Sequence, residues 1–174
     1  MKPKTPTCAY ISLGSNVENA CEMLNRYLSF LKKMPDLRVA GVSPIYMTEP
    51  QDFKAQPWFA NQVIKVKVDS GYWKPPEFLD SLLEMESRLG RRRSDNPQLR
   101  YGPRSIDADL LLFGSLKSDL PHCVLPHPRM LKRAFVLVPL ADIEPDIQIN
   151  SAGVATWLKK IDYRVAGNKI YQKG

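Results

Sequence analysis

The alternation of apolar and polar positions along the chain predicts four strands. Residues 8–13 form a short apolar run that indicates a buried strand. Residues 39–47 indicate a second strand at an edge or bulge, because Pro44 cannot donate a ladder hydrogen bond. Apolar and polar side chains alternate through residues 59–69, and residues 106–113 form the fourth predicted strand.

Two further segments predict helices between these strands. Residues 15–18 match the S-x-x-E capping box, so we expect a helix from there to about Lys33. Residues 77–89 predict a second helix with one apolar arc. That arc contains Phe78, Leu79, Leu82, Leu83, Met85 and Leu89. Glu86 falls inside it and needs a partner, either in an ion pair with a nearby arginine or in a functional role.

The order of these elements, β-α-β-β-α-β, predicts an α+β fold of the ferredoxin-like type. Its sheet is expected to be antiparallel, with both helices on one face and the fourth strand beside the first. Leu110 and Leu112 should then point toward the helices, which leaves the other face available for a ligand. A C-terminal extension follows, with a predicted helix at 130–142 and an apolar segment at 154–161. We expect residues 1–174 to form a single domain.

Charge and composition narrow the class of protein. The chain has 25 Lys and Arg against 18 Asp and Glu, and the net charge of +7 indicates an anionic partner. No apolar run is long enough to span a bilayer and no signal peptide is evident, so we expect a cytoplasmic protein. Cys8, Cys21 and Cys123 are widely spaced and are interpreted as packing residues.

Two aspartates on the fourth strand are the main candidates for chemistry. Since side chains alternate along a strand, Asp107 and Asp109 lie side by side, on the same face as Leu111 and Phe113. Close carboxylates repel each other unless a cation lies between them. Oxygen ligands favour magnesium, which completes its coordination with water and substrate phosphates. The alternative is an exposed strand face that merely carries two aspartates.

The polar segments around these strands add candidate binding groups. Residues 48–57 form a long polar loop, and such loops are often functional. Residues 91–100 are rich in arginine and predict a mobile basic loop. A charge run is usually only a solvated surface. Next to two aspartates, however, Arg100 and Arg104 suit a phosphorylated substrate.

Four segments, taken in order, carry a family resemblance that extends from residue 8 to about 145. They are AYISLGSN at 9–16, YMT at 46–48 with QPWFAN at 56–61, RYGPRSIDADLL at 100–111, and PHPR at 126–129 with RAFVL at 133–137. Together they resemble the 6-hydroxymethyl-7,8-dihydropterin pyrophosphokinases of folate biosynthesis. The third segment is similar to the signature of that family.

The resemblance implies a ferredoxin-like, magnesium-dependent pyrophosphokinase that uses ATP as co-substrate. The pterin hydroxymethyl oxygen would attack the β-phosphorus of ATP, which gives AMP and the pterin diphosphate. By similarity, Asp107 and Asp109 hold two magnesium ions and act in catalysis with Arg93 and Arg104, as suits a reaction that depends on positioning and charge neutralisation. The residues implied to contact ATP are Leu79, Arg91, Arg104, Leu110, His127 and Arg133.

The resemblance also implies a pterin site. Its residues are Thr48, Pro50, Phe59, Asn61 and Phe135. The amide of Asn61 would pair with the pterin edge, and Phe59 and Phe135 would sandwich the ring, although either phenylalanine alone could be ordinary core packing. Glu86 matches an acidic position of the family, which favours a structural ion pair beside the site.

Small-molecule substrates are therefore the expected partners, with no nucleic acid and no membrane, and we expect a monomer. A different class is an RNA-binding module, because ferredoxin-like folds also build RNA-recognition domains and the chain is basic. The aromatic RNA-binding run of those domains is missing from this sequence. A third possibility is a pterin-binding relative without activity, which the presence of both aspartates disfavours.

Overall fold

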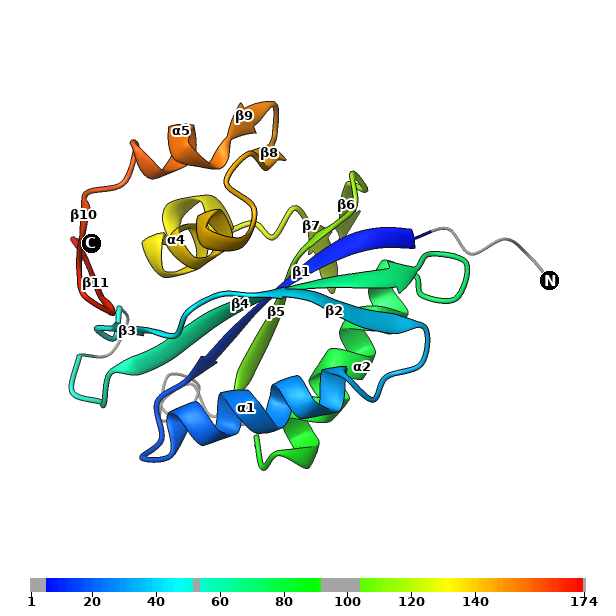
Figure 1. Ribbon diagram of the computed structural model, residues 1–174, viewed down its shortest axis with the longest axis horizontal. Coiled ribbons are helices and arrows are strands. Elements are labelled where there is room, and N and C mark those ends of the chain that lie inside the picture. Colours follow the sequence, from blue (N-terminus) through cyan, green and yellow to red (C-terminus); the bar gives the residue numbers. More distant parts are fainter. Residues whose placement is uncertain (1–5, 52–53, 92–103, 174) are drawn as a thin grey trace.

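The computed structural model describes residues 6–51, 54–91 and 104–173. It is a mixed α+β structure (Figure 1). Its helices are α1 (Ala20–Leu31), α2 (Pro75–Arg88), the short 3-10 helix η1 (Met130–Lys132), α4 (Ala134–Ile143) and α5 (Val154–Leu158). The strands of its main sheet are β1 (Pro6–Ser15), β2 (Leu37–Val42), β3 (Tyr46–Thr48), β4 (Phe59–Asp69), β5 (Asp107–Phe113), β10 (Tyr163–Ala166) and β11 (Lys169–Gln172). Two small hairpins are formed by β6 (Ser118–Leu120) with β7 (Cys123–Leu125) and by β8 (Gln148–Ile149) with β9 (Ala152–Gly153).

The main sheet has the order β10-β11-β3-β4-β1-β5, and β2 also pairs with β4. The fourth predicted strand, β5, lies antiparallel beside β1, as expected. The expectation of an antiparallel sheet is wrong at one pair, because β11 runs parallel to β3. The sheet is therefore mixed, and its extra strands come from the C-terminal extension.

The two predicted helices lie on one face of the sheet, as expected, but a helix of the C-terminal extension covers the other face. Figure 1 shows α1 and α2 against one face and α4 against the other. The helices α1 and α2 bury Tyr27 and Phe78 in a core with Ile11. The helix α4 belongs to a second core, in which Leu137 packs with Tyr10. The sheet needs this second cover because its other face also carries apolar side chains.

A bulge in β5 changes which side chains reach each core. The register pairs Ile11 with Leu110 but Tyr10 with Leu112, which leaves Leu111 as an extra residue. Beyond that point the alternation reverses. Leu112 joins the core under α4 and Phe113 joins the core under α1 and α2, opposite to both expectations. The alternation holds where it matters for the site, at residues 107–110.

Local signals placed some element boundaries wrongly. The strand at 59–69 and the carboxylate strand are confirmed, whereas the capping box is wrong because Ser15 ends β1 and α1 begins at Ala20. The predicted strand at 39–47 is divided into β2 and β3. The predicted helix at 130–142 is interrupted at Arg133, between η1 and α4.

The structure bears on two expectations drawn from composition, one on the cysteines and one on membrane-spanning segments. Cys123 is buried, but Cys21 is exposed, so its interpretation as a packing residue is wrong. Within the described ranges, no helix combines the length and the apolar character needed to cross a membrane.

Candidate active site

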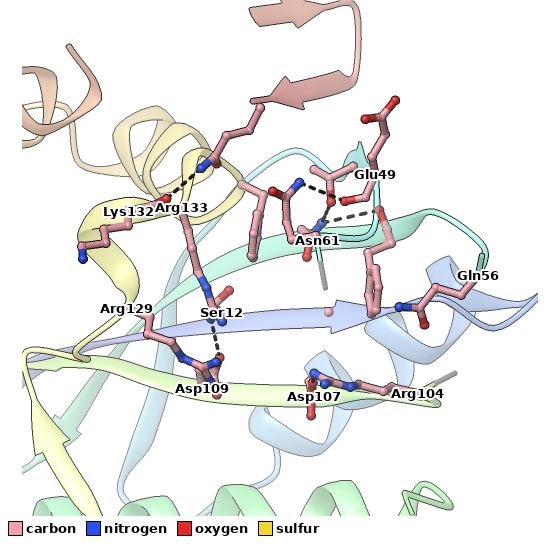
Figure 2. Close-up of a pocket in the computed structure, with 16 residues that line it drawn as sticks. Ser12, Glu49, Gln56, Asn61, Arg104, Asp107, Asp109, Arg129, Lys132 and Arg133 are labelled. Atoms are coloured by element: carbon pink, nitrogen blue, oxygen red, sulfur yellow. Dashed lines mark hydrogen bonds and ion pairs between the residues drawn. The ribbon is translucent and has the colours of Figure 1, made fainter. Parts of the chain in front are cut away.

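A cavity of about 310 Å³ opens on the face of the sheet that carries α4. Strands β1, β4 and β5 form its floor, the segment around β3 forms one side, and the start of α4 forms the other (Figure 2). The residues that line it include Ser12, Gly14, Thr48, Gln56, Phe59, Asn61, Arg104, Asp107, Asp109, Arg133, Phe135 and Gln172. Segments from both ends of the chain therefore meet here.

Asp107 and Asp109 both reach this cavity, as the alternation of side chains along β5 predicts. Asp107 pairs with Arg104 and lies 3.0 Å from a guanidinium nitrogen of Arg91. Asp109 lies 3.6 Å from Arg133, which extends toward it from the start of α4 (Figure 2). The two carboxylates are thus surrounded by cations that can also bind phosphate.

Gly14 keeps the floor open between the strands. It pairs with Asn61 on β4 and with Asp107 on β5. A Cβ at position 14 would lie 3.2 Å from the Asn61 side-chain oxygen, which is tighter than ordinary contact. The glycine therefore leaves the polar edge of Asn61 and the carboxylate of Asp107 facing one space.

Glu86 supports the carboxylate strand from the opposite face of the sheet. Its side chain is 1% exposed and accepts a hydrogen bond of 2.6 Å from the backbone N–H of Ala108. Ala108 lies between the two aspartates, so this bond fixes the backbone that carries both. The expectation that Glu86 is buried and partnered is confirmed, and its ion pair with an arginine stays a prediction.

His127 lies on the other side of Asp109, at 3.9 Å from its carboxylate. Burial lowers the pKa of His127 below its usual value, Asp109 opposes this, and Arg133 and Arg129 lower it further. The imidazole is therefore neutral at pH 7. Because the Arg129 N–H donates to Nδ1 at 3.3 Å, the hydrogen of the neutral ring lies on Nε2, the atom nearest Asp109.

The opposite part of the cavity combines aromatic and amide groups. The Asn61 amide is buried and donates to the Thr48 hydroxyl at 2.7 Å. Phe59 enters the cavity from the start of β4, and Phe135 enters it from α4. The guanidinium of Arg133 lies 5.4 Å from the Phe135 ring centroid. A flat heterocycle with polar edges matches this combination of surfaces.

A second cavity of about 240 Å³ adjoins the first, and Asp109 lines both. Most of the residues that line it are apolar, and they come mainly from α2, β5 and the β6–β7 hairpin. Leu79, Leu110 and His127, three of the predicted ATP contacts, lie here. The two cavities thus meet at a carboxylate.

The structure brings most of the predicted site residues together. Those in or beside the two cavities are Thr48, Phe59, Asn61, Leu79, Arg91, Arg104, Asp107, Asp109, Leu110, His127, Arg133 and Phe135. Pro50 is buried and is missing from the described lining of both. Arg93, Arg100 and nearly all of the predicted basic loop lie outside the described residues.

Sequence reasoning missed Asn16, which connects two parts of the site. Its side-chain oxygen accepts from the Arg104 N–H at 2.7 Å, and its amide donates to the Gln56 side chain at 3.0 Å. The chain after β1 was interpreted as a helix cap, but α1 begins four residues later. The available signal was a polar residue directly after a buried strand.

Gln172 was also missed, together with the cations Arg129 and Lys132, although all three line the first cavity. No local motif marks Gln172, since only the pairing of β11 with β3 brings it to the site. Arg129 directly precedes the predicted helix at 130–142, and Lys132 lies in its first turn. Their place in the lining depends on the break at Arg133.

Comparison with known proteins agrees with this geometry. The model of the family described as 7,8-dihydro-6-hydroxymethylpterin-pyrophosphokinase (HPPK) matches residues 10–145. The 2-amino-4-hydroxy-6-hydroxymethyldihydropteridine pyrophosphokinase of Pseudomonas aeruginosa is 39% identical over 140 residues, covering 80% of this chain and 82% of that protein. The enzyme of the same name from Bacillus subtilis is 34% identical over 159 residues, covering 87% and 91%.

Solved structures show the same fold at lower identity. The wild-type HPPK-DHPS protein of Plasmodium falciparum superimposes with a TM-score of 0.67 at 14% identity, covering 97% of this chain. The present chain spans 46% of the length of that larger chain. The likeness supports the arrangement of helices and strands, while the sequence relatives carry the information on chemistry.

Proposed function

The chain belongs to the 7,8-dihydro-6-hydroxymethylpterin-pyrophosphokinase family, and we propose which of its residues bind each substrate. The reaction of this family is pyrophosphoryl transfer from ATP to hydroxymethyldihydropterin in folate synthesis. The observation that carries the proposal is the pair of adjoining cavities that meet at Asp109. The cavity that contains Phe59, Asn61 and Phe135 suits the pterin, and the cavity lined by Leu79 and Leu110 suits the adenine. The triphosphate then lies over Asp107 and Asp109.

Asp107 and Asp109 are proposed to hold two magnesium ions. Among the described residues, no cluster of three or more His, Cys, Asp or Glu side chains could hold a metal alone. Two carboxylates nevertheless fit magnesium, because this ion commonly takes one or two carboxylates and shares its other positions with water and phosphate. When bound, the ions would neutralise the triphosphate and polarise the β-phosphoryl group.

The arginines around the aspartates are proposed to hold the triphosphate. Arg91, Arg104 and Arg133 already lie against the two carboxylates. The buried Nε of Arg91 has no acceptor among the described residues, which supports an anionic ligand at this position. His127 can donate from Nε2 to a phosphate oxygen. Arg93 is proposed to act with Arg104 in catalysis, although it lies outside the described residues.

The pterin is proposed to bind between Phe59 and Phe135, with its edge toward Asn61 and the backbone of Thr48. Its hydroxymethyl oxygen would then face the β-phosphorus. A bond forms between that oxygen and phosphorus, the bond from the β-phosphorus to the bridging oxygen of the α-phosphate breaks, and AMP leaves. The hydroxyl proton is released. The protein contributes mainly by orientation, because holding two reactants in place removes much of the entropic barrier.

The adenine is proposed to lie in the second cavity against Leu79 and Leu110. Both side chains come from elements that are fixed by the core under α1 and α2. The pterin and nucleotide pockets therefore rest on opposite sides of β5.

We also propose the fold type, the domain organisation and the general properties of the enzyme. The strands β5, β1, β4 and β2 with α1 and α2 form a ferredoxin-like plait, to which α4 and the C-terminal strands are added. Both cores share β1 and β5, which supports one domain over 1–174. We further propose a monomeric, magnesium-dependent, cytoplasmic enzyme.

An assay of AMP release tests this function. Purified protein is incubated with magnesium and ATP, with and without 6-hydroxymethyl-7,8-dihydropterin, and with EDTA in a parallel sample. AMP and the pterin diphosphate should form in equal amounts, and only when pterin and magnesium are both present. AMP release that is independent of the pterin would contradict the assignment.

A further inference from the structure

The side chain of Gln172 forms a bidentate contact with the junction between η1 and α4. Its Oε1 accepts from the Ala134 N–H at 2.8 Å, and its Nε2 donates to the Lys132 carbonyl at 2.8 Å. The amide orientation is determined by these partners, because only the oxygen can accept and only the nitrogen can donate. One side chain therefore holds two backbone groups that are two residues apart.

These two groups belong to the peptide planes on either side of Arg133. The Lys132 carbonyl lies in the plane before the Arg133 Cα, and the Ala134 N–H lies in the plane after it. Fixing both planes fixes φ and ψ of Arg133, which are −121° and 105° at the break between the helices. Arg133 provides no side-chain cap for α4, and Gln172 accepts instead from the first amide of the helix, that of Ala134.

The strand that carries Gln172 is fixed to the opposite side of the cavity. β11 pairs with β3 through Lys169–Met47 and Ile170–Thr48, and Ile170 is buried. The ring of Tyr171, beside Gln172, makes an edge contact with Trp58 at 5.6 Å between centroids. Figure 1 shows β11 beside β3. Through the hydrogen bonds of Gln172, this C-terminal strand also reaches the start of α4.

We propose that Gln172 is a positioning residue that sets the backbone of Arg133 and thereby aims its guanidinium at the reacting phosphates. The inference rests on the proposed function, which places Arg133 at the triphosphate. Gln172 lies outside residues 10–145, the part of the chain that the family model matches. This chain thus uses its C-terminal extension to complete a site that the family segment begins.

The first measurement needs no variant. By its position, the Ala134 amide is the first of α4, and such amides lack a partner inside the helix. If Gln172 holds it, its hydrogen exchange in the intact protein should be slowed by about tenfold or more relative to an unprotected amide. Exchange at the unprotected rate would overturn the contact.

The second measurement is a double-mutant cycle. Gln172→Met keeps the length of the side chain and removes both hydrogen bonds. It should lower kcat/KM for the pterin by about tenfold or more, since small displacements of a positioning group are costly. In an Arg133→Ala background the same change should have an effect of less than about twofold, because the residue that Gln172 positions is already absent. Equal losses in both backgrounds would show a merely structural role and overturn the proposal.

Lys173→Gln is the matched control. Lys173 is the next residue, and its exposed side chain pairs with Asp162 at 3.3 Å, away from the cavity. It should retain wild-type kcat/KM, and a loss as large as that of Gln172→Met would overturn a specific role of Gln172. If the wild type itself released no pterin-dependent AMP, the proposed function would fall, while the exchange of Ala134 would still decide the contact.

Discussion

The floor and the far wall of the cavity are built in different ways. The floor, defined here by Asp107, Asp109 and Asn61, lies on β5 and β4, which both pair with β1 without interruption at these residues. The far wall, defined by Arg133 and Phe135, lies at a break between two helices and is held by one side chain from the C-terminal strand. Regular strand pairing holds the carboxylates of Asp107 and Asp109 in fixed positions. Side-chain contacts hold the residues of the far wall.

Removing a floor carboxylate should have the largest effect. We expect Asp107→Ala or Asp109→Ala to lower kcat by about a thousandfold or more, because each would remove a metal ligand from a reaction that depends on charge neutralisation. Both side chains are partly exposed, so the folded structure should persist. Steady-state AMP formation and circular dichroism measure the two effects. The control is Asp119→Ala, whose side chain is exposed on β6. Wild-type turnover in either site variant would refute the metal assignment.

The support beneath the floor should be the next most sensitive point. Glu86→Ala leaves the buried Ala108 N–H without its acceptor, and we expect a loss of about 2–3 kcal/mol in the free energy of unfolding. Urea denaturation measures it. The control is Glu84→Ala on the same helix, whose carboxylate forms an exposed pair with Arg88 and should cost under about 0.5 kcal/mol. Equal losses in the two variants would mean that the hydrogen bond to β5 is unimportant.

Sequence patterns predicted the floor well because its geometry is local. Alternation along β5 is enough to place Asp107 and Asp109 together, and the same pattern gave β4 its bounds. It failed only at Leu111, where an extra residue shifts the phase by one. A bulge has no strong sequence signal, so the change of side at Leu112 and Phe113 could not be foreseen.

The far wall was less predictable because its geometry depends on contacts distant in sequence. The apolar pattern favoured one helix over 130–142, and it contains no sign that Arg133 is extended. That conformation is joined to a residue near the C-terminus, 38 positions away. Asn16 was misjudged for the same reason, since its partner Arg104 is 88 positions distant.

The far wall should respond to substitution with a smaller and more selective effect than the floor. We expect Phe135→Ala to raise KM for the pterin by about tenfold, because it removes one of the two proposed stacking surfaces, worth about 1 kcal/mol or more. KM for ATP should change by less than about twofold. Initial-rate kinetics with each substrate varied in turn measure the difference. An equal rise in both values would show that the helix, and not the pterin contact, had been disturbed.

The smallest expected effect concerns the cluster of Glu144, Lys65 and Tyr10, which connects the end of α4 to β4 and β1. Glu144, directly after α4, accepts hydrogen bonds from Lys65 on β4 and Tyr10 on β1. The bonds from Lys65 and then Tyr10 hold the pKa of Glu144 below its usual value. The stabilisation from Glu144 is therefore present above its unfolded pKa and is lost as the pH falls through the folded pKa. The cluster is partly exposed, so we expect less than about 1 kcal/mol. Urea denaturation at pH 7 and at pH 3 measures this effect. The loss of stability between the two pH values should be smaller for Glu144→Gln than for the wild type. Identical losses would exclude any contribution of this carboxylate to the pH dependence.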